Sequence, residues 1–158
     1  MTAAAHPTGP APQADAEPPF VWTDAFLLGY GPMDDTHREF VEVVHALQQA
    51  ADADLLAALD AFIAHAQAHF GSEDRWMEDT GFPPRDCHIK EHAAVLASAE
   101  AVRQTLIDDA DVDNCRGFID ALIDWFPGHA DHLDSALSHW MCKQRMGGKP
   151  VVLRRDLG

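Results

Sequence analysis

The sequence predicts an all-α fold: an up-down-up-down four-helix bundle with an N-terminal arm and a short C-terminal tail. Apolar residues recur at spacings of three and four along four long segments, the periodicity of amphipathic helices. Short loops join these segments, which favours antiparallel neighbours. The 158 residues are 47% hydrophobic, enough for one domain with one closed core.

The first predicted helix starts at Pro32, since proline suits the first helical position and two aspartates follow in the first turn. A capping box from Thr36 to Glu39 would start this helix later. Met33 already belongs to the apolar stripe, however, so we expect the earlier start. The stripe then continues through His37, Phe40, Val44 and Leu47.

Three more helices are expected, over about 54–79, 85–108 and 113–141. The loop Gly81-Phe82-Pro83-Pro84 separates the second helix from the third. Pro127 lies inside the fourth helix, where it removes one backbone hydrogen bond and should bend the helix.

Both ends differ in composition from the helical domain expected over 20–142. Residues 1–19 are rich in alanine and proline and are predicted to form a disordered tail. The apolar arm that follows, beginning at Phe20, should pack on the bundle. Residues 143–158 hold five of the eleven basic residues. This basic C-terminal tail either lies on the acidic bundle or docks a protein partner.

The charge balance limits the classes of partner. Acidic residues outnumber basic ones 26 to 11, so the formal charge is −15. Nucleic acids and anionic membranes attract the opposite charge, so we expect no nucleic-acid partner and no membrane insertion.

The sequence has neither an apolar run of about 20 residues nor a secretory signal pattern. Three dispersed cysteines do not suggest a disulfide framework, and we expect a cytoplasmic protein.

Polar residues interrupt the apolar stripes of all four predicted helices. Two pairs of these residues, His69 with Glu73 and His88 with His92, are four residues apart and therefore share a helix face. Buried imidazoles and carboxylates are costly unless they are paired or bind a metal. Groups converging from four helices predict a carboxylate-bridged dinuclear site, and ligands without a thiolate suit iron or manganese, with zinc possible. The seven candidate metal ligands are His37, His69, Glu73, His88, His92, His129 and Asp134.

The spacing of His129 and Asp134 does not fit a regular helix. Five residues correspond to a rotation of about 140°, so the two side chains would face different ways. We therefore expect either a bend at Pro127 or a π-like turn to bring the two side chains together.

The remaining histidines are expected to lie outside the site. His65 is on the same face as His69, and we expect it to pack as a polar side chain. His132 is three residues after His129 and could be mistaken for the ligand, and His45 and His139 are expected to be at the surface or partly buried, without a role. Cys87 should point away from the metal face as an ordinary packed thiol.

These motifs resemble the bacterial hemerythrin family over about residues 20–142. The matching elements are Trp22-x6-Gly29 with Met33-Asp34-x-x-His37, His69-Phe70-x-x-Glu73 with Met77, His88-x-x-x-His92, and Trp125-Phe126-x-x-His129-x4-Asp134.

The resemblance implies two non-haem iron ions joined by an oxo or hydroxo bridge. One iron would be held by His88, His92 and His129, and the other by His37 and His69. Glu73 and Asp134 would bridge them. Two six-coordinate irons offer twelve positions, and these ligands with one bridging oxygen fill all but one. The open position falls on the iron with two histidines, where dioxygen would bind.

The function implied is reversible dioxygen binding by a carrier, store or local supplier that is not an enzyme. Two alternatives remain. A sensor of oxygen, redox state or nitric oxide would have to act through the basic tail, since no further domain is expected after residue 142. An oxidase or peroxidase is disfavoured, because five histidines leave room only for a small ligand.

Overall fold

The computed structural model describes residues 17–147, which form an all-α bundle as predicted. No strand occurs within this range. Two 3-10 turns, η1 (Asp24–Phe26) and η2 (Asp52–Asp54), lie in the arm and in the first interhelical loop. The bundle consists of α1 (Gly31–Gln49), α2 (Leu55–Thr80), α3 (Arg85–Asp109) and a last long helix built from α4 (Val112–His129), the π-turn η3 (Ala130–Asp134) and α5 (Ser135–Arg145).

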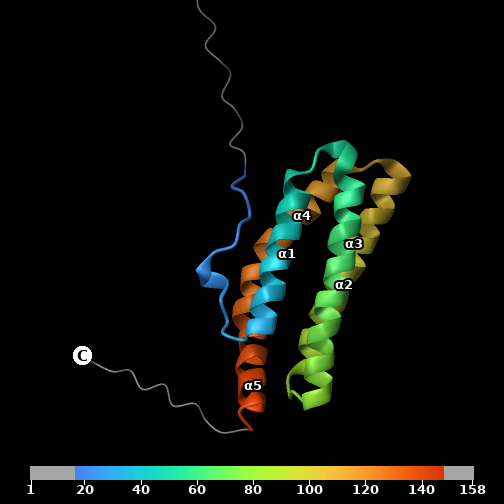
Figure 1. Ribbon diagram of the computed structural model, residues 1–158. Coiled ribbons are helices and arrows are strands. Elements are labelled where there is room, and N and C mark those ends of the chain that lie inside the picture. The colour runs from blue at the N-terminus through green and yellow to red at the C-terminus, as the bar shows by residue number, and fades with distance from the viewer. Residues whose placement is uncertain (1–16, 148–158) are drawn as a thin grey trace, which may run out of the picture.

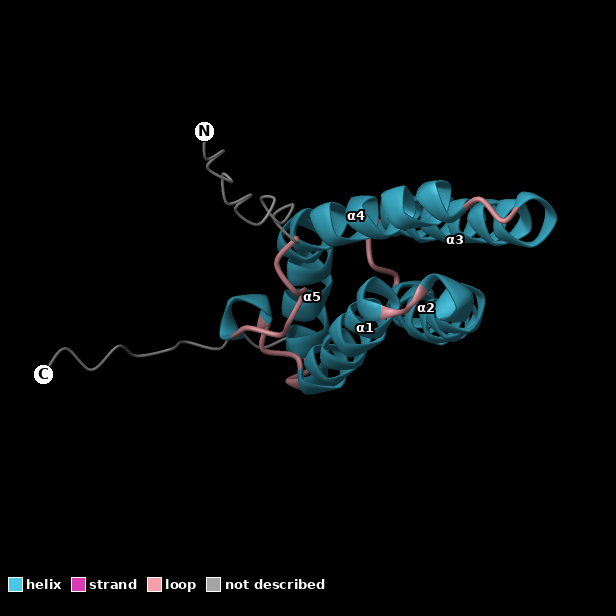
Figure 2. Cartoon of the chain, turned by 90° about the horizontal axis from the view of Figure 1, so that it is seen from above, coloured by secondary structure: helices cyan, strands magenta, loops and turns pink. Residues whose placement is uncertain are grey.

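The long helices lie side by side and alternate in direction (Figure 1). α1 packs on α2, α2 on α3, α3 on α4, and α4 on α1. Seen from above, α1 and α2 lie on one side and α3 and α4 on the other (Figure 2). This is the up-down-up-down topology that short loops favour.

The first helix begins early, as the apolar stripe predicted. α1 starts at Gly31 with Pro32 as its second residue. The Thr36 hydroxyl donates a hydrogen bond to the carbonyl of Pro32 and does not cap a later start. The buried Asp34 carboxylate accepts hydrogen bonds from the backbone N–H groups of Leu28 and Gly29. This aspartate therefore fixes the end of the arm against the first helical turn.

Left-handed residues end the second and third helices. Gly81 follows α2 with φ of 65°, and its N–H bonds back to the carbonyls of Glu78 and Met77. Ala110 follows α3 with φ of 52°. The Asp111 carboxylate then caps α4 by accepting a hydrogen bond from the N–H of Asn114. These local signals make the two sharp reversals of the chain.

The last helix resolves the five-residue spacing by a π-turn. In η3 the N–H of Ser135 bonds to the carbonyl of Ala130, five residues earlier. The wider turn accommodates one extra residue. As a result His129 Nε2 and Asp134 Oδ1 lie 3.2 Å apart. Of the two expected solutions, the structure has the π-like turn, with Pro127 inside α4 just before it.

Two apolar clusters lie above and below a polar layer. The larger one includes Phe40, Phe62 and Phe126 and fills the upper bundle. The smaller one fills the lower end, one turn beyond the polar positions, and includes Tyr30, Met33, Met77, Phe82, Leu137 and Met141. The polar layer between them is therefore closed to water at both ends of the bundle.

The N-terminal arm packs on the bundle as expected. Phe20 is buried, its ring lies edge-on to Phe126 at 5.9 Å, and its N–H donates to the Gln48 side chain. Trp22 packs on Phe26 and under the guanidinium of Arg38.

The predicted tails fall mostly outside the described residues. Of residues 1–19 only 17–19 are described, and there the Pro18 carbonyl accepts a hydrogen bond from Gln48. At the other end α5 continues to Arg145, whose guanidinium lies over the Tyr30 ring. Residues 148–158, which hold most of the basic tail, are not among those described.

Two glycine substitutions should have opposite effects. Gly81→Ala should lower the free energy of unfolding by about 1 kcal/mol, because alanine is strained at a left-handed φ. Gly117→Ala, in the middle of α4 with no atom near the added Cβ, should raise it by about 0.5–1 kcal/mol. Urea unfolding of both variants measures the difference. Equal effects of the same sign would contradict the assignment of Gly81 as the helix-ending residue.

Candidate metal centre

All seven candidate ligands meet in the polar layer between the apolar clusters. None of them is more than 5% exposed. Their nitrogen and oxygen atoms form two groups that are each compact enough to hold one metal ion. One group contains Glu73, His88, His92, His129 and Asp134, and the other contains His37, His69 and Glu73. The structure thus brings together every candidate that the sequence predicted.

Glu73 divides its two carboxylate oxygens between the groups. Its Oε1 lies 2.9 Å from Nε2 of His69 and 3.5 Å from Nε2 of His37. Its Oε2 lies 3.3 Å from Nε2 of His92 and 3.6 Å from Nε2 of His88. A carboxylate that faces two sets of imidazoles with separate oxygens is arranged to bridge two ions.

Asp134 shows the same division from the opposite side. Its Oδ2 lies 3.2 Å from Nε2 of His37. Its Oδ1 lies 2.9 Å from Nε2 of His88 and 3.2 Å from Nε2 of His129. The two carboxylates therefore each connect the histidine pair on α1 and α2 with the three histidines on α3 and α4.

The unpaired atoms in this layer fit a pair of metal ions. Nε2 of His37, Nε2 of His88, Oε2 of Glu73 and Oδ1 of Asp134 are buried and have no hydrogen-bond partner within the described chain. Buried polar groups are normally satisfied, and each exception needs an explanation. Metal ions at the centre would use these lone pairs, and the nitrogen and oxygen donors are those that iron accepts.

Without metal, the buried histidines and carboxylates shift one another's pKa values. Burial alone would lower the pKa of His37, but Asp134 and Glu73 outweigh it and raise that pKa to about 9. Burial would also lower the pKa of His129, but Asp134, with Glu91 and Glu73, outweighs burial and raises that pKa. Burial would raise the pKa of Glu73, yet the surrounding histidines hold it well below its usual range. Metal binding must therefore displace protons from these imidazoles.

The other histidines within residues 17–147 lie outside both groups. His65 packs beside Phe40 and His69, and its Nε2 is buried without a partner in the described chain. Burial, followed by the charges of His69 and His37, lowers the pKa of His65 to about 4, so this side chain is neutral at pH 7. His132 and His139 are exposed, and His45 is half-buried.

Cys87 points away from the metal face as expected, but the expectation of a packed thiol was wrong. This thiol is exposed and is not packed in the interior. Cys87 is one residue before His88, about 100° around α3, and that rotation carries it past the neighbouring helices to the surface.

Two residues of the site were not found from the sequence. Asp74 Oδ1 lies 2.7 Å from Nδ1 of His92, and Glu91 Oε2 lies 2.7 Å from Nδ1 of His129. Each carboxylate reaches from one helix to a histidine of the next. The only sequence signal is an acidic residue directly beside a candidate ligand, namely Asp74 after Glu73 and Glu91 before His92.

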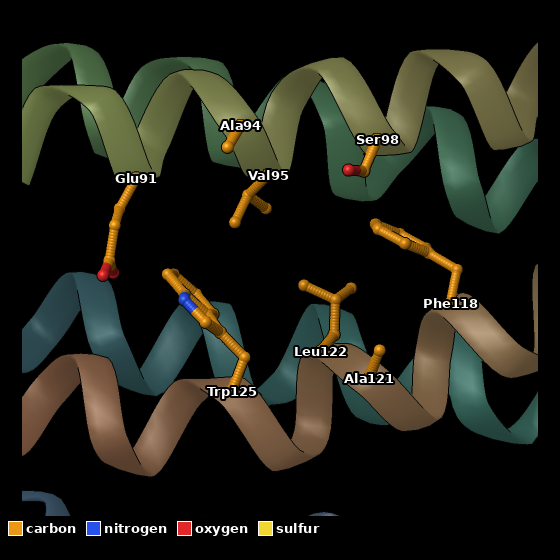
Figure 3. A pocket seen from close by; sticks show the side chains of 8 residues that line it. All are labelled: Glu91, Ala94, Val95, Ser98, Phe118, Ala121, Leu122 and Trp125. Atoms are coloured by element: carbon orange, nitrogen blue, oxygen red, sulfur yellow. The ribbon is translucent and has the colours of Figure 1, made fainter.

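Glu91 also borders a groove on the outside of the bundle. The groove lies between α3 and α4 and has a volume of about 350 Å³. Figure 3 shows Glu91 at one end beside Trp125, with Val95, Phe118 and Leu122 further along. The Trp125 ring lies 4.3 Å from that of His129. Glu91 and Trp125 therefore both line the groove and contact His129.

The fold and site define a helical bundle with a buried cluster of histidines and carboxylates that can hold a metal pair, and comparisons place it in a family. The family model described as Hemerythrin HHE cation binding domain matches residues 28–139. The bacteriohemerythrin of Ralstonia nicotianae is 38% identical over 127 residues, covering 80% of this chain and 92% of its own length. The myohemerythrin of Sipunculus nudus is 29% identical over 119 residues, covering 73% and 88%.

The chain belongs to the hemerythrin family. Hemerythrin domains are di-iron, oxygen-binding domains, and the buried histidine and carboxylate cluster of this chain can hold a metal pair. Between residues 17 and 147, no helix is both long and apolar enough to cross a membrane.

Loss of a bridging carboxylate should damage the centre more than loss of His65. Asp134→Ala removes a group that faces both histidine sets, so the iron content at saturating iron should fall below two per chain. His65→Ala should retain both irons, because His65 lies outside both groups. Metal analysis of the purified variants checks this. If His65→Ala loses iron while Asp134→Ala keeps two, the assignment is wrong.

Metal should be required for full stability. In its absence five imidazoles and two carboxylates face one another in a layer closed by apolar clusters. Metal that binds only the folded chain stabilises it by about 2.7 kcal/mol at a hundredfold excess over its Kd. Thermal unfolding with and without iron measures the effect, and equal melting temperatures would contradict it.

Proposed function

We propose that His88, His92 and His129 hold one iron, that His37 and His69 hold the other, and that Glu73 and Asp134 bridge them. The observation that carries this assignment is the division of each carboxylate between the two histidine sets. An iron pair supplies the electrons that reversible dioxygen binding requires. On this assignment the protein binds dioxygen reversibly as a carrier, store or local supplier.

The asymmetry of the ligand set supports a site for one small molecule. The pair His37 and His69 offers one imidazole fewer than the three histidines of the other group. Glu73 and Asp134 each face both groups, so they do not make up for the missing imidazole on the side of His37 and His69. An exogenous ligand should therefore bind on the side of His37 and His69.

Two phenylalanines close that side of the site. The rings of His37, His69, Phe40 and Phe126 form a closed circuit, with neighbouring centroids 5.2, 5.7, 4.7 and 5.4 Å apart. An apolar wall keeps water and protons from the ligand. Trp22 packs on Phe26, which packs on Phe126, so this tryptophan supports the wall from outside.

The same wall supports a binding role over substrate oxidation. Phe40 and Phe126 are fully buried and stacked, which leaves no route for a bulky substrate between them. A diatomic ligand needs far less space than an organic substrate. We therefore propose that the protein is not an enzyme, and that an oxidase or a sensor is the alternative if oxygen binding proves irreversible.

The test is oxygen exposure of the reduced, iron-loaded protein. We expect a ligand-to-iron charge-transfer band under oxygen that disappears when oxygen is removed, with two irons per chain. Immediate oxidation to a ferric form, with no such band and no recovery, would overturn the binding role and favour the oxidase or redox-sensor alternative.

Opening the wall should speed autoxidation without removing iron. Phe126→Leu keeps an apolar side chain but creates space beside His37, so water should reach the bound ligand and oxidation should be several-fold faster. Phe62→Leu makes the same change in the upper core, where Phe62 packs on Phe40 and Phe118.

Autoxidation rates and iron content of these two variants, measured side by side, check the prediction. Equal rates in both variants would show that Phe126 does not shield the ligand.

A further inference from the structure

Two carboxylates outside the ligand set hold two of the histidines by their outer nitrogens. Nε2 of His92 and of His129 faces the cluster, so a neutral ring that binds a metal ion there carries its proton on Nδ1. Nδ1 of His92 donates to Asp74, and Nδ1 of His129 donates to Glu91, each at 2.7 Å. These hydrogen bonds fix both the tautomer and the orientation of the two rings.

The hydrogen bonds to histidine Nδ1 atoms are distributed unequally between the two histidine groups. Nδ1 of His37, His69 and His88 is buried and has no hydrogen-bond partner among the residues described. Both outer carboxylates therefore serve the group of three histidines, and neither serves the pair.

A carboxylate that accepts the Nδ1 proton makes an imidazole a stronger electron donor. It also adds negative charge near one of the two metal positions, which favours the more oxidised state of an ion held there. Water weakens this effect in part, because the side chains of Asp74 and Glu91 are 28% and 48% exposed. Both hydrogen bonds are nevertheless part-buried, because the two histidine rings lie in the buried layer.

We propose that Asp74 and Glu91 are positioning residues that lower the reduction potential of the iron held by His88, His92 and His129. The two irons then differ in how easily they are oxidised. This inference rests on the ligand assignment proposed above, but it concerns residues that touch neither iron.

The test replaces each outer carboxylate with the amide of the same shape, which removes its negative charge. Asp74→Asn and Glu91→Gln each retain an oxygen that can accept the Nδ1 hydrogen bond. The variants are made singly and together in the full-length, iron-loaded protein. The controls are Asp79→Asn on α2 and Glu100→Gln on α3, which lose the same charge from exposed positions.

Iron content is measured at saturating iron, and the midpoint potential by spectroelectrochemical titration. We expect two irons per chain in all variants. The potential should shift upward in Asp74→Asn and in Glu91→Gln, by more in the double variant, and by less in either control. Glu91→Asp, which restores the charge on a shorter side chain, should recover part of the shift.

The outcomes separate this inference from the proposed function. Two irons with potentials equal to those of the controls would overturn the inference alone. A variant that cannot load two irons would also overturn it, in favour of a purely structural role. An unmodified protein with fewer than two irons would overturn the ligand assignment itself, and this inference with it.

Discussion

A layer of five imidazoles and two carboxylates buried between apolar clusters is the constraint on which the rest of the structure depends. Such groups lose their hydration on burial, and the loss is large unless each finds a partner. Here the partners come from all four helices, so the layer also fixes how the helices are rotated about their axes. The aromatic clusters above and below exclude water, which strengthens every interaction within the layer.

The backbone is arranged to serve this layer. α2 contributes His69 and Glu73 one turn apart, and α3 contributes His88 and His92 in the same way, so regular helices suffice there. The last helix could not place both His129 and Asp134 inward without the π-turn. The irregularity is found at the point where the chemistry needs it, and the helices remain regular elsewhere in the bundle.

Much of the site could be predicted because its information is local. Helical spacing predicts which residues of one helix share a face, and the four sets could be recognised together as a family pattern. The start of α1 was also decided locally, by the position of Met33 in the stripe.

Contacts between helices could not be predicted in this way. Asp74 supports His92 on the next helix, and Glu91 supports His129 on the next, so finding them requires the relative rotation of the helices. The same limit explains Cys87, whose burial depends on where α3 meets its neighbours. Spacing also left two solutions for the last helix, because a kink and a π-turn both satisfy a five-residue interval.

The π-turn determines where the last helix tolerates a change in length. Removing a single residue between His129 and Asp134 would leave a chain that forms a regular α-helix with better backbone geometry. Four residues of a regular helix correspond to a rotation of about 40°, so Asp134 and the apolar Leu137 and Met141 would keep their inward faces. A deletion elsewhere in α4 or α5 has no wide turn to absorb it, and everything after it would rotate by about 100° relative to the rest of the bundle. The wide turn is therefore the place in the last helix where the chain could lose a residue and still keep both Asp134 and the lower apolar cluster in position.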